Sequence, residues 1–175
     1  MTNNFFIILD GPMGAGKTTV TNILFHKLKR TVVLSFDVQK LSITDFGLER
    51  EKDYKMISSV RKSIAIQYMK HGFNILMDGG FFSGEKIKPF INLAKTKGYR
   101  LFIYHLEAST ETLLKRAVDR SNLGSERNKI SEQNIQNYIS FHAENKYQGE
   151  EVVKINSGEL SPEEIVSKIL VDIGT

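Results

Sequence analysis

The sequence predicts an α/β fold in which one parallel β-sheet carries helices on both of its faces. Short apolar runs of the kind found in buried strands alternate with longer segments whose apolar residues recur at helical spacing. A glycine-rich segment joins the first apolar run to the first helical segment, and neither a repeat nor a linker interrupts the 175 residues. With 41% hydrophobic and 25% charged residues, the chain has the composition of one soluble globular domain.

Hydrophobic periodicity places each element along the chain. Five apolar runs predict strands, at residues 5–9, 31–36, 73–77, 100–106 and 151–155. Apolar residues at helical spacing predict the helices, at about residues 17–29, 53–71, 87–97, 110–120, 132–139 and 162–171. Residues 38–52 have no periodicity and contain Gly47, which indicates an irregular loop or a short helix near the glycine-rich segment.

Capping residues mark where several of these helices begin and end. Asp53 is expected to cap the long helix before the third strand, and Ser109 and Ser131 to cap two later helices. Gly98 closes the helix before the fourth strand. The run Ser161-Pro162-Glu163-Glu164 is a capping box with proline at the first helical position, so a last helix is expected there.

The glycine-rich segment is Gly11-Pro12-Met13-Gly14-Ala15-Gly16-Lys17-Thr18, and it fits the Gly-x-x-x-x-Gly-Lys-Ser/Thr pattern of a phosphate-binding loop (P-loop). Glycines let the backbone N–H groups approach a polyphosphate at the positive end of a helix. Lys17 supplies a mobile charge for the outer phosphates, and the Thr18 hydroxyl is placed to ligate Mg²⁺. A glycine-rich turn without a ligand is the alternative, but the flanking strand and helix favour a nucleotide site.

Charge and residue usage narrow the classes of function. The chain has no cysteine, which excludes a disulfide framework, a Cys-ligated zinc and a thiol nucleophile. The net charge of +4 favours anionic substrates without requiring nucleic acid. Neither a secretory signal nor a membrane span is indicated, so a cytoplasmic protein without a membrane partner is expected. The four histidines lack ligand spacing, and surface or core positions explain them better than a metal: His26, His71, His105 and His142.

The order of these parts resembles the small P-loop kinases of the adenylate kinase-like superfamily. It is most similar to the group with shikimate and gluconate kinases, chloramphenicol phosphotransferase, zeta-toxin-like kinases and bacteriophage polynucleotide kinase. Besides the P-loop, the resemblance rests on Ser35-Phe36-Asp37, on Asp78-Gly79-Gly80 and on Arg116 and Arg120. It implies a three-layer P-loop NTPase fold with five parallel strands in the order 2-3-1-4-5. It also implies that residues 1–175 form a single kinase domain, with a lid near residues 120–130 and the acceptor between the ends of strands two and three.

The resemblance gives two carboxylates a role. Asp37 corresponds to an aspartate that contacts the acceptor hydroxyl and takes its proton, and the alternative is a local turn with its own backbone. Asp78 corresponds to a residue that binds Mg²⁺ directly or through water, and the alternative is a capping position. Relatives carry another carboxylate two residues before Asp37. This chain has Ser35 there, which leaves open which group helps to hold magnesium.

Basic and aromatic residues complete the candidate site. Arg116 and Arg120 resemble lid arginines that stack on adenine or neutralise the transferring phosphoryl group, and a solvated helix face is the alternative. Several further residues are weaker candidates for the site. They are Arg127 in the lid, Arg61 as a ligand of an anionic acceptor or a solvent-exposed residue, Ser157 and Gly158 as backbone contacts to adenine, and Phe81 and Phe82 as an acceptor wall or core.

These predictions define three sets of residues. The catalytic set is Lys17, Asp37, Arg116 and Arg120. The nucleotide-binding set is Gly11, Met13, Gly14, Ala15, Gly16, Lys17, Thr18, Thr19 and Arg116. The magnesium ligands are Thr18 and Asp78.

The function expected from these residues is ATP- and Mg²⁺-dependent transfer of a γ-phosphoryl group to a hydroxyl or phosphate of a small-molecule or nucleotide acceptor. A polynucleotide 5′-hydroxyl kinase is less favoured because Lys and Arg are spread along the chain rather than clustered. The alternative from another class is a nucleotide-binding regulatory ATPase or switch that makes no phosphorylated product.

Overall fold

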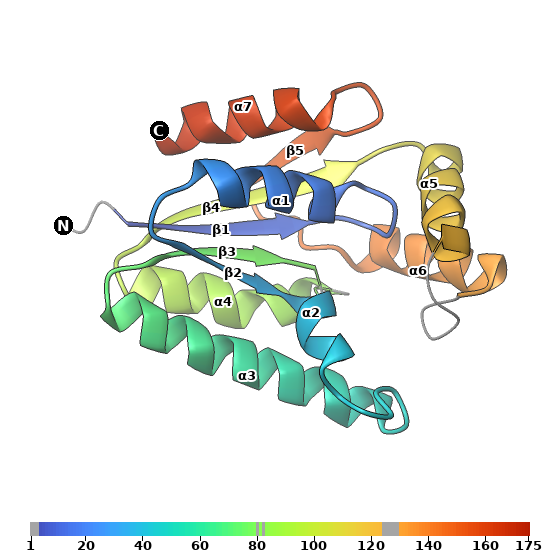
Figure 1. The fold of residues 1–175 in the computed structure, drawn as a ribbon, viewed down its shortest axis with the longest axis horizontal. Helices are drawn as coiled ribbons and strands as arrows, with labels where there is room; N and C mark the ends of the chain where they lie inside the picture. Colours follow the sequence, from blue (N-terminus) through green and yellow to red (C-terminus); the bar gives the residue numbers. More distant parts are fainter. Residues whose placement is uncertain (1–3, 80, 82, 124–129) are drawn as a thin grey trace.

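The computed structural model describes residues 4–79, 81, 83–123 and 130–175. Figure 1 shows a central parallel sheet between two layers of helices. The strands are β1 (Phe5–Asp10), β2 (Thr31–Ser35), β3 (Asn74–Asp78), β4 (Arg100–Glu107) and β5 (Val152–Asn156). Their order is β2-β3-β1-β4-β5 and all neighbours run parallel, which confirms the predicted order 2-3-1-4-5.

Helices cover both faces of this sheet and one of its ends. They are α1 (Lys17–Lys27), α2 (Phe36–Leu41), α3 (Arg50–Lys70), α4 (Gly84–Thr96), α5 (Thr110–Leu123), α6 (Glu132–Asn145) and α7 (Pro162–Ile173). In Figure 1, α1 and α7 lie on one face, and α3 and α4 lie on the other. The pair α5 and α6 stands beyond the carboxyl ends of the strands, and α2 follows β2 at the same edge.

Strand β1 is the centre of the core, and all six of its residues are buried. Because side chains alternate along a strand, Ile7 and Leu9 pack into the cluster beneath α1 and α7, whereas Phe6 and Ile8 pack into the cluster against α3 and α4. The register pairs Leu9 with Asp78 in β3. The carboxyl ends of β1, β2 and β3 therefore meet at one edge, where parallel sheets place their ligands.

The predicted caps are confirmed for three helices. The Oγ of Ser109 accepts the Thr112 N–H at 3.2 Å, and the Oγ of Ser131 accepts the Asn134 N–H at 3.3 Å. Ser161 and Glu164 form the reciprocal hydrogen bonds of a capping box at the start of α7.

The start of α3 differs from the prediction. Helix α3 begins at Arg50, three residues before the expected cap, and the Asp53 carboxylate instead accepts the Gly47 N–H at 2.8 Å. Asp53 thus ties down the preceding turn, in which Gly47 has a φ of 102°. Strand β2 ends at Ser35, and Phe36, which was predicted to end the strand, begins α2. Helix α2 overlaps residues 38–52 only up to Leu41, and turns follow up to α3.

The predicted lid overlaps the described structure only in part. Arg120 belongs to α5, which continues to Leu123, while residues 124–129, including Arg127, lie outside the described residues. Gly80 and Phe82 also lie outside them. In the part of the chain that is described, no helix is both long and apolar enough to cross a membrane.

Candidate functional site

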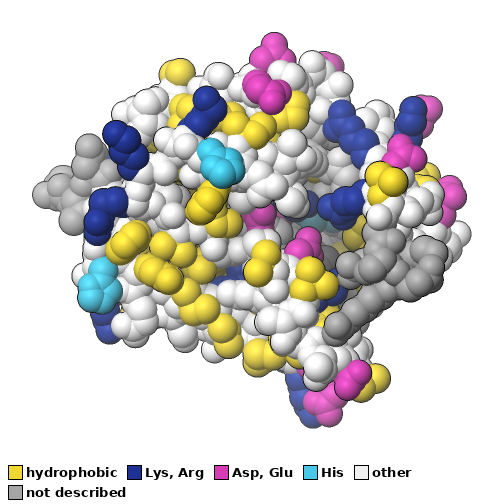
Figure 2. Space-filling view, viewed as in Figure 1, with side chains coloured by type: hydrophobic (Ala, Val, Ile, Leu, Met, Phe, Trp, Pro, Cys, Tyr) yellow, Lys and Arg dark blue, Asp and Glu magenta, His cyan; other side chains and the backbone are white. Residues whose placement is uncertain are grey.

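A cavity of about 440 Å³ opens at the carboxyl edge of the sheet, between the P-loop, α2, α5 and α6. Figure 2 shows acidic and basic side chains around this hollow. It gathers most of the predicted site into one space: Gly11, Met13, Gly14, Gly16, Lys17, Thr18, Thr19, Asp37, Arg116 and Arg120. Two predicted residues are not in its lining. The Ala15 methyl is buried in the core, and Asp78 lies buried at the end of β3.

The P-loop backbone needs glycine for two physical reasons. Gly11, Gly14 and Gly16 have φ values of 145°, 83° and 90°, which L-residues with side chains rarely adopt. A Cβ on Gly14 would also overlap the Leu113 carbonyl oxygen of α5. Helix α1 begins directly after Gly16 without a side-chain cap, so its first N–H groups remain available for an anion.

Lys17 lies on the P-loop side of the cavity. Its ammonium donates to the carbonyl oxygens of Gly11 and Pro12, at 2.7 and 2.8 Å. Burial lowers the pKa of Lys17, and the negative charges of Asp10, Asp37 and Asp78 oppose that shift. The charges of three carboxylates therefore act on the lysine that the motif assigns to phosphate.

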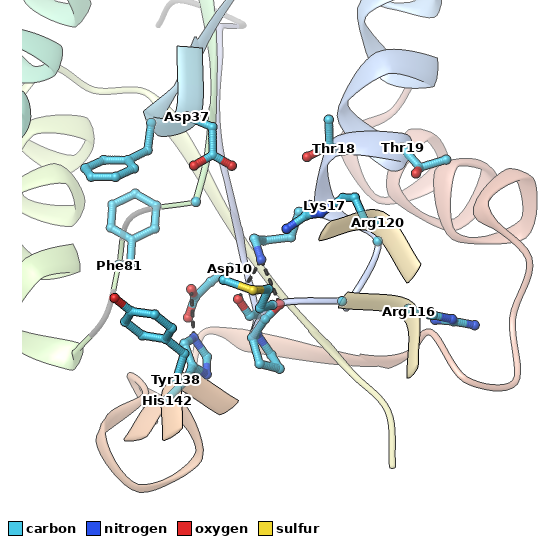
Figure 3. A pocket seen from close by; sticks show the side chains of 17 residues that line it. Asp10, Lys17, Thr18, Thr19, Asp37, Phe81, Arg116, Arg120, Tyr138 and His142 are labelled. Atoms are coloured by element: carbon cyan, nitrogen blue, oxygen red, sulfur yellow. Dashed lines mark hydrogen bonds and ion pairs between the residues drawn. The ribbon is translucent and has the colours of Figure 1, made fainter. Parts of the chain in front are cut away.

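Asp37 and Lys17 lie on opposite walls of the cavity. Asp37 is in the first turn of α2, and its carboxylate is exposed on the wall across from Lys17 (Figure 3). The Phe81 ring lines the same wall. It also packs edge-to-face against Phe90, with ring centroids 5.6 Å apart, so it is both core and cavity wall.

Arg61 is a structural residue rather than a surface group. It is 1% exposed, and its guanidinium donates to the carbonyl oxygens of Leu34 at 2.8 Å and of Asp78 and Gly79 at 3.0 Å. Burial lowers its pKa to about 10, against the charges of Asp78 and Asp37, so it stays positive at neutral pH. The expectation of a solvent-exposed position is wrong, because Arg61 joins the ends of β2 and β3 behind the cavity.

The two predicted lid arginines point in different directions. Arg116 donates to the Ser157 carbonyl oxygen at 3.1 Å and extends away from the cavity centre in Figure 3. Arg120 reaches back towards Lys17, and its charge contributes to the lowered pKa of that lysine. Arg116 therefore lies at the β5 side of the cavity, whereas Arg120 lies near the phosphate-binding lysine.

A second cavity of about 550 Å³ adjoins the first and was not predicted from the sequence. It lies between α3, α4 and α6, and Tyr138 lines both spaces. Its lining is aromatic and polar, consisting of Glu51, Tyr54, Lys86, Asn134, Asn137, Tyr138 and Phe141. The α6 residues follow the spacing i, i+3, i+4 and i+7 of one helix face, a signal that was available in the sequence.

A buried cluster of Asp10, His105 and His142 lies beside the P-loop and was also missed. The Asp10 carboxylate contacts His105 Nδ1 at 3.3 Å and His142 Nε2 at 3.2 Å. Burial alone would raise the pKa of Asp10. The two histidines lower it by more than burial raises it, so the pKa lies well below its usual value. The three residues come from β1, β4 and α6, so no local spacing could have indicated them.

Comparisons with known proteins agree with this arrangement. A family model described as an AAA domain matches residues 6–144. A shikimate kinase from Enterococcus faecalis is 30% identical over 177 residues, which cover 94% of this chain and 95% of that protein.

Solved structures share the fold across most of the chain. A candidate kinase from Chloroflexus aurantiacus J-10-fl has a TM-score of 0.73 at 19% identity, covering 95% of this chain and 97% of its own. Shikimate kinase from Aquifex aeolicus VF5 has a TM-score of 0.59 at 19% identity, covering 97% and 96%. A chain of the Pnkp1/Rnl/Hen1 RNA repair complex has a TM-score of 0.67 at 18% identity, covering 81% of this chain and 44% of its own.

The family match spans most of the chain, and it includes the P-loop and the elements that line the cavity. The five-stranded sheet order is the one expected from the resemblance. This chain therefore belongs to the AAA-domain family and is a small P-loop kinase-type protein of the adenylate kinase-like superfamily.

Proposed function

We propose that this protein is an ATP-dependent phosphotransferase that moves the γ-phosphoryl group of ATP to an acceptor hydroxyl or phosphate. The observation that carries the proposal is that Lys17 of the P-loop and the Asp37 carboxylate line one cavity from different sides. One wall supplies backbone N–H groups and a cation for the donor phosphates. The other supplies a base for the acceptor, so both substrates fit one space.

The donor side is built for a nucleoside triphosphate. The N–H groups at the start of α1 and the Lys17 ammonium offset phosphate charge, and we expect Lys17 to leave the loop carbonyls when phosphate binds. Mg²⁺ prefers oxygen ligands, and the Thr18 hydroxyl in the cavity and the Asp78 carboxylate behind it are of that kind. When bound there, the ion would offset the charge of the β- and γ-phosphate oxygens.

Two carboxylates line the cavity, those of Asp10 and Asp37, and Asp37 is the better candidate for the catalytic base. The Asp10 carboxylate already accepts from two histidines and its pKa is lowered, so it is a poor proton acceptor. Asp37 is exposed to the cavity. In the proposed step the acceptor oxygen bonds to the γ-phosphorus, its proton passes to Asp37, and the bond to the departing ADP oxygen breaks.

The two arginines would have different roles, one in phosphoryl transfer and one in nucleotide binding. Arg120 reaches towards Lys17 and is placed to offset charge on the transferring phosphoryl group. Arg116 contacts the Ser157 carbonyl after β5, which supports a role for it at the nucleoside end of ATP. We therefore expect turnover to depend more on Arg120 and ATP affinity more on Arg116.

The second cavity is the proposed acceptor site. It meets the first at Tyr138, so an acceptor held there can present a hydroxyl to Asp37. Its aromatic rings and carboxamides suit a ring compound with hydrogen-bonding groups. The Enterococcus relative makes shikimate the first acceptor to test.

The experiment is label transfer from γ-labelled ATP in the presence of Mg²⁺. Acceptors would be shikimate, other sugars and cyclitols, nucleosides, nucleotides and 5′-hydroxyl oligonucleotides, beside a reaction without acceptor. We expect one acceptor class to become labelled, and Lys17→Ala to abolish the transfer. Release of phosphate only to water would contradict the proposal and favour a regulatory ATPase.

A further inference from the structure

We propose that Asp10, His105 and His142 form a binding site for a divalent transition-metal ion of the zinc type, beneath the P-loop and separate from the Mg²⁺ that would accompany ATP. The inference does not depend on the proposed phosphotransfer. It rests on the spacing, the burial and the chemistry of three side chains that the fold brings together from β1, β4 and α6.

The spacing of the donor atoms suits ligands around one ion. Asp10 Oδ2 lies 3.3 Å from His105 Nδ1, Asp10 Oδ1 lies 3.2 Å from His142 Nε2, and one donor atom from each residue lies within 4.8 Å of the others. In a tetrahedral zinc site with bonds of about 2.0–2.1 Å, neighbouring donors are about 3.3 Å apart. Charge-assisted hydrogen bonds to a carboxylate are usually about 2.7–2.9 Å. Both contacts to Asp10 are longer than that. Each contact uses a different oxygen of the carboxylate, so an ion held by both imidazoles either contacts both Asp10 oxygens or requires a small shift of the Asp10 side chain.

The site is buried and held by the sheet. Asp10, His105 and His142 are 3%, 2% and 5% exposed. Asp10 and His105 are register neighbours on β1 and β4, and the rings of His105 and His142 are stacked with centroids 5.2 Å apart. Donors fixed in this way lose little entropy when an ion binds.

The donor set selects the class of metal. Two imidazole nitrogens and one carboxylate suit Zn²⁺ and neighbouring first-row ions, whereas Mg²⁺ and Ca²⁺ prefer oxygen donors. Asp10 and His142 line the 440 Å³ cavity. His105 and His142 line a further cavity of about 270 Å³. The cluster therefore adjoins a cavity on each side, which provides routes for an ion and room for a water as fourth ligand.

Charge around the P-loop gives the ion a role. The Asp10 carboxylate contributes one negative charge to the lining of the cavity proposed for polyphosphate, and Lys17 is among the cations that offset it. A bound dication would make the net charge of the cluster positive, which favours phosphate. It would also join α6 directly to the residue that precedes the P-loop.

One feature of His142 limits the expected affinity. A metal at Nε2 leaves the proton on Nδ1, and that atom is buried without a hydrogen-bond partner among the described residues. Loss of such an outer partner typically weakens a site by about 10–100-fold. We therefore expect a Zn²⁺ dissociation constant of about 1 µM rather than the far lower values of fully supported structural sites.

The test uses the metal-stripped full-length protein and titrates Zn²⁺ calorimetrically and Co²⁺ by visible absorption. We expect one equivalent to bind and Co²⁺ to develop the intense bands of a four-coordinate ion. His142→Gln and Asp10→Asn should each weaken Zn²⁺ binding by more than about 100-fold. The exposed histidines provide matched controls, because His26→Gln and His71→Gln should bind as the wild type does.

Two results would overturn the proposal. One is wild-type protein that binds no Zn²⁺ at concentrations up to about 100 µM, a hundred times the expected dissociation constant. The other is binding that His26→Gln or His71→Gln abolishes while His142→Gln retains it, which would indicate a surface site. The first result is read on the wild type alone, so instability of the buried variants does not affect it. For the second, circular dichroism of His142→Gln shows whether that variant is folded when its Zn²⁺ binding is measured.

Discussion

Replacing the buried Arg61 with methionine is expected to lower the free energy of unfolding by about 3 kcal/mol. Methionine fills a similar volume but can donate no hydrogen bond. The change removes the guanidinium that joins the Leu34 carbonyl at the end of β2 to the Asp78 and Gly79 carbonyls after β3. The ends of β2 and β3, which precede Asp37 and part of the cavity wall, would then lose the guanidinium that they share.

The expected loss of stability is the contribution of three hydrogen bonds less the cost of burying the cation. Hydrogen bonds from a charged donor contribute about 1.5–3 kcal/mol each, so the three contacts of Arg61 contribute about 4.5–9 kcal/mol before costs. Burying a cation costs several kcal/mol, and methionine avoids that cost. The difference leaves about 3 kcal/mol, a large part of the 5–15 kcal/mol typical of a domain.

Urea unfolding followed by circular dichroism measures this difference. Lys62→Met is the matched control, because Lys62 is the exposed neighbour on the same helix and its replacement should change stability by less than about 0.5 kcal/mol. A loss below about 1 kcal/mol for Arg61→Met would refute the reasoning, since it would mean that the three carbonyls do not need the guanidinium.

Three further predictions follow from the site and the helix caps. Gly14→Ala should destabilise the protein more than Gly16→Ala in the same urea assay, because both have positive φ but only the Cβ at position 14 overlaps a neighbouring carbonyl. Arg120→Ala should lower turnover more than ATP affinity in steady-state kinetics, and Arg116→Ala should do the reverse. Hydrogen bonds from Ser161 lower the pKa of Glu164 in the folded state. The stability that the Glu164 carboxylate contributes is therefore fully present above its unfolded pKa and is lost as the pH falls through its lower folded pKa. The stability difference between wild type and Glu164→Gln should therefore narrow in acid.

Local signals in the sequence predicted the parts of the structure that depend on local physics. The P-loop, the buried strands and the Ser109, Ser131 and Ser161 caps each arise from a few neighbouring residues, and the structure contains them. The strand order also agreed, because the resemblance supplied a topology that composition alone does not fix. Asp53 failed as a cap since its carboxylate bonds a turn residue six positions earlier.

Long-range packing explains what the sequence did not reveal. Arginine is usually exposed, so nothing local indicated that Arg61 would be buried among strand-end carbonyls. Asp10, His105 and His142 meet only because β4 pairs with β1 and α6 packs beyond both. The α6 face of the second cavity was detectable from its helical spacing, but only the fold shows that it faces α3 and α4.

The most direct test of the central claim compares wild type with Asp37→Asn in single-turnover transfer of labelled phosphate to the acceptor identified in the panel. If Asp37 takes the acceptor proton across the cavity from Lys17, transfer should slow by about 10²–10⁴-fold while ATP affinity stays unchanged. Transfer by Asp37→Asn at nearly the wild-type rate would contradict the account, because the carboxylate facing the P-loop would then play no part in the chemistry.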